Sequence, residues 1–293
     1  MLVTKLLICP SHREAVGFLS HAAPLSNVLL LGQGLLEYWV SALACSGVKR
    51  IIILAHDRPE QVQALAGTGE RWGLELKIVA ESRELTPAQA LLKYGAEFGP
   101  VPEPDAISVL DHFPGLPQYP LFGDYRGWFE ALCHWMPHAI TPDRVGTHEM
   151  HPRVWVGTDS HISPEAQLHA PCWIGRHVFV GARTVVGPRA IVEDGAFLEP
   201  EAEVSHSVIG PDTFMGKLAR IVDSVAWGDM LINWRSGSLT KVPDPFLLCA
   251  LRQQRKSRTA GWLARLAELY ARNREGCRGD VESPVTPQGG VVS

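Results

Sequence analysis

The sequence lacks four features that would assign it to whole classes of protein. None of its 293 residues belongs to an apolar run of membrane-spanning length, and the opening stretch Leu2 to Cys9 is too short and too weakly flanked for a signal peptide. Its six cysteines include no C-x-x-C pair, so we expect neither a zinc site nor a disulfide framework. A formal net charge of -4 provides no basic surface for nucleic acid. We therefore expect a cytoplasmic protein that binds neither a membrane nor nucleic acid.

The second half of the sequence contains a six-residue repeat. From Val156 to Val204 a large aliphatic residue stands at every sixth position, and after a slip of five the spacing resumes from Ile209 to Trp227. Many of these residues are followed directly by glycine. Short strands of this period stack into a parallel β-solenoid, in which the aliphatic side chains form one continuous core. The glycines are expected at the corners, where the backbone adopts angles that side chains resist.

The first half alternates apolar segments with amphipathic ones. The pattern predicts strands at residues 2–9, 48–54, 74–80 and 106–110, and helices at 35–46, 57–66, from 86 onward and at 125–136. Strands that alternate with helices indicate a parallel, doubly wound sheet. Such sheets bind ligands at the carboxyl ends of their strands. Residues 10–25 and the stretch after Leu110 are therefore expected to surround any site.

The chain is predicted to divide into four regions. An α/β domain at 1–145 precedes the solenoid at 150–240. Asp244 and Pro245 are typical of a helix start and predict a helix at 246–251. With an amphipathic stretch at 259–273, this gives C-terminal helices at 244–275. Residues 276–293 are polar and rich in proline and glycine, and we expect a disordered tail there.

Two segments resemble a known family. Residues 24–54, PLSNVLLLGQGLLEYWVSALACSGVKRIIIL, resemble the sugar-nucleotide pyrophosphorylases, the nucleotidyltransferases that join a sugar 1-phosphate to a nucleoside monophosphate. The six-residue repeat resembles the hexapeptide repeats of left-handed β-helices, which end many members of that family. The resemblance implies a shortened, doubly wound (Rossmann-like) nucleotidyltransferase domain followed by a left-handed β-helix.

The resemblance also shows which family residues are replaced. The family's Gly-x-Gly-x-Arg loop aligns with Ser11, His12, Arg13, Glu14 and Ala15, and its Pro-Lys-Pro segment aligns with residues 24–26. Ala15 and Leu25 thus stand where an arginine and a lysine neutralise phosphate charge. Of the family's metal-binding Gly-Asp pair, the sequence keeps the aspartate, as Asp111, without the preceding glycine. The resemblance therefore implies a pseudoenzyme with weak or absent catalysis and a binding or regulatory role in nucleotide-sugar or surface-polysaccharide biosynthesis.

Two alternatives stay open. The chain is an active sugar-1-phosphate nucleotidyltransferase if Arg13 and His12 contact phosphate and Asp111 holds Mg²⁺; otherwise His12 and Arg13 are solvated loop residues. It is a hexapeptide-repeat acyltransferase if a solenoid histidine serves as general base, and the candidates are His161, His169, His177 and His206. Polar residues are expected at solenoid corners in any case. The implied partners are a nucleotide sugar and, through the β-helix, a second copy of the chain or an active pyrophosphorylase.

Overall fold

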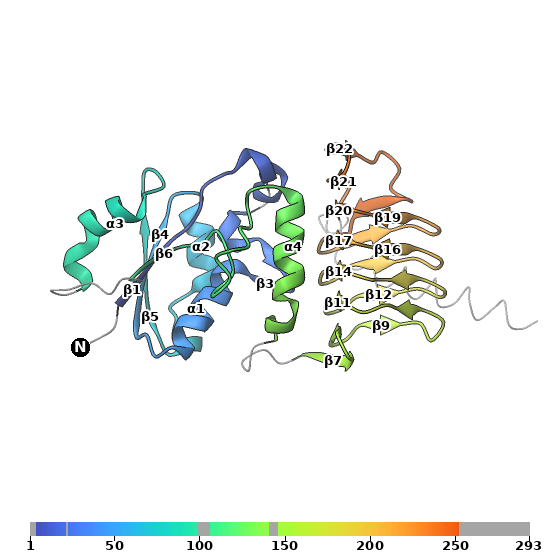
Figure 1. Cartoon of the computed structure of the whole chain (residues 1–293), viewed down its shortest axis with the longest axis horizontal. Helices are drawn as coiled ribbons and strands as arrows, with labels where there is room; N and C mark the ends of the chain where they lie inside the picture. The colour runs from blue at the N-terminus through green and yellow to red at the C-terminus, as the bar shows by residue number, and fades with distance from the viewer. Residues whose placement is uncertain (1–3, 22, 99–105, 141–145, 252–293) are drawn as a thin grey trace, which may run out of the picture. The chain divides into compact units, whose positions relative to one another are not determined.

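The fold begins with a four-stranded parallel sheet, shown in the computed structural model of Figure 1. The structure describes residues 4–21, 23–98, 106–140 and 146–251. The strands pair in the order β5-β4-β1-β6, all in parallel. Their bounds are β1 Thr4–Ile8, β4 Arg50–Ala55, β5 Glu75–Ala80 and β6 Ile107–Val109. This agrees with the predicted mixed α/β fold, while the assignment to a Rossmann-like nucleotidyltransferase domain stays a prediction.

Helices lie at the predicted places between these strands. They are α1 (Leu35–Cys45), α2 (Pro59–Ala66), α3 (Pro87–Tyr94) and α4 (Tyr125–Trp135). One face of the sheet packs into a core that includes residues of α1, α2 and α4, and the other packs against residues of α3 and the following turn. Successive strand residues point to opposite faces, so Ile52 and Ile53 enter different cores. Short elements complete this half: η1 (Glu14–Ser20), η2 (Leu25–Asn27), β2 (Leu29–Leu30), β3 (Gln33–Gly34), η3 (Glu70–Trp72), η4 (Gly95–Phe98) and η5 (Met136–His138).

The six-residue repeat forms a parallel β-helix, as predicted. Its coils contribute to three sheets, of eight, five and four strands, and the stacked strands are visible in Figure 1. Each strand pairs in parallel with its equivalent one coil later, so Ile174 pairs with Val192 and Val192 with Ile209. The inward aliphatic residues form one core. The strands of the first sheet's coils are β8 (Val154–Gly157), β11 (Cys172–Ile174), β14 (Ala190–Val192), β17 (Ser207–Ile209) and β20 (Ser224–Trp227).

The other two sheets take one short strand from each coil. The five-stranded sheet contains β9 (His161–Ile162), β12 (Phe179–Val180), β15 (Phe197–Leu198), β18 (Thr213–Met215) and the terminal β23 (Leu248–Ala250). The four-stranded sheet contains β10 (Gln167–Leu168), β13 (Val185–Val186), β16 (Glu203–Ser205) and β19 (Arg220–Val222). The left hand of the β-helix stays an implication of the family resemblance.

Antiparallel strands complete the sheets at both ends of the β-helix. β7 (Thr147–His151) pairs with β8, and β21 (Met230–Asn233) with β22 (Ser238–Lys241) follows β20. The predicted helix at 246–251 is wrong, because β23 pairs there with β18. Leu248 is buried in the solenoid core, and pairing satisfies backbone groups that an open sheet edge would leave exposed. The predicted amphipathic stretch at 259–273 and the tail at 276–293 lie outside the described residues.

Most of the solenoid glycines have a different role from the predicted one, although Gly187 (φ 105°) and Gly228 (φ 63°) do have the left-handed angles expected at corners. Gly157 and Gly181 have ordinary φ angles, and left-handed angles occur instead three places after the aliphatic residue, at Asp159 (φ 58°) and His177 (φ 56°). A Cβ at Gly181 would lie 2.5 Å from the backbone nitrogen of Pro200. These glycines are thus required by the close approach of successive coils, and the turns are made by other residues.

Candidate functional site

The segment that follows β1 carries most of the residues predicted to form the site. It does not form an open loop, because residues 14–20 fold into the 3-10 helix η1 with Val16 and Leu19 buried. The Val16 N–H donates to the Arg13 carbonyl oxygen at 3.2 Å, and the Phe18 N–H donates to the Tyr125 hydroxyl at 3.2 Å. These two backbone N–H groups are therefore already hydrogen-bonded to acceptors within the protein.

Arg13 forms a bidentate ion pair with Glu84, which follows β5. Its Nη1 donates to Glu84 Oε2 at 2.8 Å and its Nη2 to Oε1 at 2.6 Å. The Ser11 N–H and hydroxyl also donate to Glu84 Oε2, at 2.9 Å and 2.5 Å. Burial opposes ionisation of Glu84, but the hydrogen bonds from Arg13 and Ser11 outweigh it and lower the pKa of Glu84 to about 2. Arg13 and Glu84 are therefore both charged and mutually neutralised at neutral pH.

Asp111 lies after β6 and interacts with its neighbour. His112 Nδ1 is 2.6 Å from Asp111 Oδ1, and the Asp111 side chain is half exposed. Its negative charge reaches Arg13, since it contributes, after Glu84, to raising the Arg13 pKa. Within the described ranges, no three His, Cys, Asp or Glu side chains are grouped so as to hold a metal ion. Mg²⁺ is commonly held by one or two carboxylates together with phosphate oxygens and water, so a Mg²⁺ ligand role for Asp111 stays a prediction.

His12 is directed away from the Arg13 ion pair. Its Nδ1 lies 2.5 Å from Ser20 Oγ, and the Ser20 hydroxyl donates to the Gly17 carbonyl oxygen at 2.8 Å. Because that hydroxyl proton is used, His12 Nδ1 is the donor to Ser20 and Nε2 is left to accept. His12 and Glu14 line a cavity of about 450 Å³, together with Gly17, Phe18, His21, Tyr125, Met230 and Leu239. The structure therefore separates two residues that the sequence places side by side.

The positions of the two missing cations have different surroundings. Leu25 is fully buried within the core of the α/β half, in η2. Ala15 is exposed on η1. A methyl group and a buried isobutyl group provide no contact to phosphate, so the substitutions inferred from the resemblance have not been offset at those two positions.

Arg58, after β4, is also engaged within the protein. Its Nε and Nη2 donate to the Asp57 carboxylate at 2.9 Å and 2.8 Å, and Nη2 donates to the Ser20 carbonyl oxygen at 2.7 Å. Arg58 is the N-cap residue of α2, and no side chain caps this helix. Asp57 binds the guanidinium of its neighbour instead. Both Arg13 and Arg58 thus form ion pairs with carboxylates at the carboxyl edge of the sheet.

Glu84 was missed by the sequence analysis, although a signal for it exists. An acidic residue follows three of the four strands of the sheet: Asp57 after β4, Glu84 after β5 and Asp111 after β6. The rule that parallel sheets bind ligands at the carboxyl ends of their strands applies to all three segments.

The contact between the two halves was also missed. The outward residues of the first solenoid sheet, Trp155, Trp173, Ile191, Val208 and Val225, belong to the same buried core as the α/β half. They precede the inward residue in every third hexad, which makes those strands apolar on both faces. The recurrence of this second apolar residue in every third hexad was visible in the sequence. In the last of these strands the inward residue is Ala226 and not the predicted Trp227, because Ala226 pairs with Ile209 and lies in the solenoid core.

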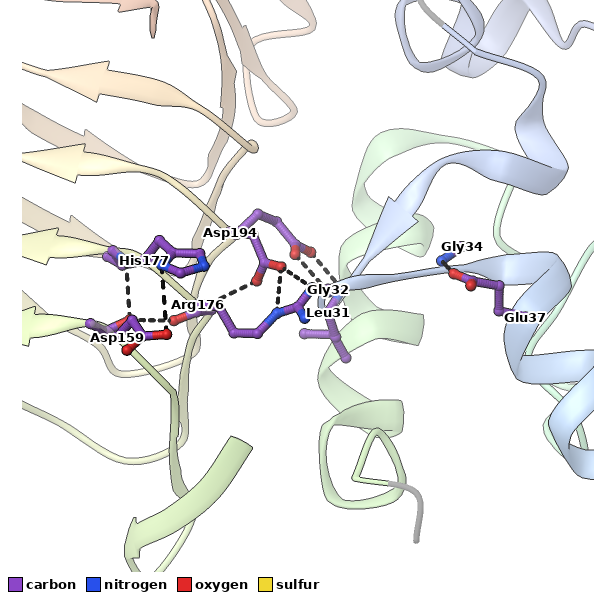
Figure 2. A network of polar contacts seen from close by, with 12 residues as sticks. Leu31, Gly32, Gly34, Glu37, Asp159, Arg176, His177 and Asp194 are labelled. Carbon is purple, nitrogen blue, oxygen red and sulfur yellow. Dashed lines mark hydrogen bonds and ion pairs between the residues drawn. The ribbon is translucent and has the colours of Figure 1, made fainter. Parts of the chain in front are cut away.

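A buried carboxylate joins the solenoid to the β2–β3 turn. Glu193 is 1% exposed, and it accepts hydrogen bonds from the backbone N–H groups of Leu31 at 2.6 Å and Gly32 at 2.8 Å. Figure 2 shows Leu31 and Gly32 directed toward the coil that carries Arg176 and Asp194. This contact fixes a turn in the first half against a strand end in the second.

The four solenoid histidines lie at the surface, three of them exposed and His206 half-buried. His177 and His206 have left-handed backbone angles at corners, and their Nδ1 atoms lie 3.9 Å from Asp159 and 3.8 Å from Asp223. His161 stacks on Phe179 with ring centroids 5.3 Å apart. His169 is exposed. None of these contacts by itself distinguishes a catalytic histidine from an ordinary corner residue.

Comparisons with known proteins identify no family. No family model matches the chain, and no curated protein matches it. Among solved structures, it is similar to a histidine-to-asparagine mutant of perosamine N-acetyltransferase from Caulobacter crescentus in complex with CoA and GDP-perosamine. The identity is 12% and the TM-score 0.18, over 61% of this chain and 93% of that one. A similarity this weak does not transfer a site or an activity.

None of the described helices is long and apolar enough to cross a membrane.

Proposed function

We propose that this protein is a nucleotidyltransferase-like protein without pyrophosphorylase turnover, which acts by binding in nucleotide-sugar or surface-polysaccharide biosynthesis. The family resemblance of residues 24–54 supports the first part of this proposal. The observation that carries the second is the bidentate ion pair between Arg13 and Glu84. Arg13 lies in the segment that aligns with the family's phosphate-binding loop, and its guanidinium is neutralised by the protein itself.

The loss of free cations explains why turnover is expected to be absent. Phosphoryl transfer depends on preorganised positive charge around the transferring group, and removal of one such contact costs roughly a hundredfold to a thousandfold in rate. Leu25 provides no charge, and Arg58 is bound to Asp57. Several of the positively charged contacts that a transferring phosphoryl group requires are therefore missing together.

A pyrophosphorolysis assay tests the proposal. The full-length protein is incubated with pyrophosphate, Mg²⁺ and a panel of nucleotide sugars, and release of nucleoside triphosphate is measured. We expect no turnover above the protein-free control. Turnover that Arg13→Ala and Asp111→Ala both abolish would instead establish the active nucleotidyltransferase. A Glu165→Ala variant, altered on an exposed solenoid corner, is the matched control.

A second candidate function is acyl transfer by the solenoid. It is motivated by the exposed His177, whose Nδ1 lies 3.9 Å from the Asp159 carboxylate, because histidine is the side chain that most often serves as general base. Calorimetry with acetyl-CoA tests this candidate. Binding that His177→Ala leaves intact would remove the histidine from the site, and absence of binding would dismiss acyl transfer.

A further inference from the structure

Glu84 occupies the centre of a set of converging donors. Its carboxylate accepts from the Ser11 N–H, the Ser11 hydroxyl and two nitrogens of Arg13, at distances from 2.5 to 2.9 Å. Arg13 Nη1 also donates to Ser11 Oγ at 2.9 Å, which orients the hydroxyl proton toward Glu84. The donors come from the segment after β1, and the acceptor comes from the segment after β5.

These donors are the types that bind phosphate. A planar guanidinium binds two oxygens of one oxyanion, and a backbone N–H with a hydroxyl completes the coordination of a tetrahedral group. The site lies at the carboxyl edge of a parallel sheet, where ligands of such folds bind. The Arg13 and Glu84 side chains are 36% and 23% exposed, so an anion from solvent reaches this position without rearrangement of the core.

We propose that Ser11 and Arg13 form a phosphate-binding site that the chain's own Glu84 occupies. In the wild-type protein Glu84 competes as an intramolecular ligand, at an effective concentration of millimolar or more. A phosphate group of ordinary affinity therefore does not displace it. Removal of the Glu84 carboxylate leaves the Ser11 and Arg13 donors open to a phosphate or diphosphate group from solution.

This inference rests on the proposed function only in that the segment after β1 aligns with the family's phosphate-binding loop, and it assigns no ligand to the wild-type protein's binding role. Turnover by the wild-type protein would refute the proposed function, and the titration below would still report on the phosphate site. Failure of the titration would refute the phosphate site and leave the turnover result untouched.

Anion titration of Glu84→Ala tests the inference. The melting temperature of the full chain is followed against inorganic phosphate, pyrophosphate and acetate at constant ionic strength, and the dissociation constants are measured by calorimetry. At ten times the dissociation constant, phosphate or pyrophosphate should raise the variant's melting temperature by roughly 3–6 °C. The wild-type protein should show no rise at the same concentration.

Two controls separate a built site from unspecific charge effects. The double variant Glu84→Ala with Arg13→Ala should lose the response. Glu81→Ala should also show none, although it frees Lys93, because Glu81 binds Lys93 and Tyr94 rather than Ser11. If Glu84→Ala does not fold, Glu84→Gln replaces it, since it keeps the volume and removes the charge. No phosphate response in a folded variant, a response that survives Arg13→Ala, or a response to acetate alone would overturn the inference.

Discussion

Substitution of Glu193 by alanine should destabilise the protein far more than loss of any exposed carboxylate. Glu193 is almost fully buried and accepts the N–H groups of Leu31 and Gly32. A hydrogen bond to a charged group contributes about 1.5–3 kcal/mol, and the two N–H groups would be left buried without this acceptor. Entry of water and relief of carboxylate desolvation offset part of this. We expect Glu193→Ala to lower the free energy of unfolding by about 3–5 kcal/mol.

The turn that Glu193 binds makes the expected loss specific. Leu31 has a left-handed φ of 52°, which is unfavourable for a bulky side chain, and Gly32 follows with a φ of 78°. On the other side, the Tyr38 hydroxyl donates to the Leu30 and Leu31 carbonyl oxygens at 3.0 Å and 3.2 Å. The turn is thus hydrogen-bonded both to Tyr38 of helix α1 and to Glu193 of the solenoid. Glu193→Ala removes the hydrogen bonds to Glu193 and leaves those from Tyr38.

Urea denaturation followed by tryptophan fluorescence measures the change in stability. Hydrogen exchange at the Leu31 and Gly32 amides provides the local readout, and both should exchange faster in Glu193→Ala. Glu165→Ala is the control, because Glu165 and its partner Arg183 are both 61% exposed, and exposed ion pairs contribute little. A Glu193→Ala protein within about 1 kcal/mol of wild type, with unchanged exchange at both amides, would refute the reasoning.

Three further outcomes are expected. The Glu84 pKa is about 2 in the folded protein and 4.5 in the reference state. The ion pair with Arg13 therefore stabilises the protein fully above about pH 4.5, and this stabilisation is lost as the pH falls toward 2. The difference in melting temperature between wild type and Glu84→Gln should shrink over that range, and a constant difference would contradict the prediction. Trp173→Ala should lower the free energy of unfolding, measured with denaturant, by about 3–5 kcal/mol, because this fully buried side chain packs into the core shared by both halves. A decrease below about 1 kcal/mol would show that the shared core is not closely packed. Gly175→Ala should lower the melting temperature, because its Cβ would lie 2.6 Å from the Asp194 backbone nitrogen. Gly95→Ala is the control, because the space around Gly95 is open. Equal melting temperatures for the two variants would contradict the close approach of the coils.

Periodicity in the sequence was enough to predict the solenoid. Inward side chains such as Ile174 and Val192 must recur with the coil, because each one completes a core that its own strand cannot close. The alternation of strands and helices in the first half was equally predictable. The residues at 246–251 were not, since their choice between helix and strand depends on the open edge of β18, which the local sequence does not contain.

The candidate site was predicted only in part. Arg13 and Asp111 were found because the resemblance aligns them with known positions, and both do lie at the carboxyl edge of the sheet. Their partners were not found. Glu84 is distant from Arg13 along the chain, and only the pairing of β1, β4 and β5 brings the two segments together. The direction of His12 toward Ser20 likewise depends on the local fold of η1.

The position of the Arg13 side chain in the presence of substrate tests the central claim most directly. A crystal structure of the wild-type protein with Mg²⁺ and a nucleotide sugar would show it. We predict that the Arg13 guanidinium stays within hydrogen-bond distance of Glu84. An Arg13 that has left Glu84 for a nucleotide phosphate beside a bound magnesium ion would contradict the account.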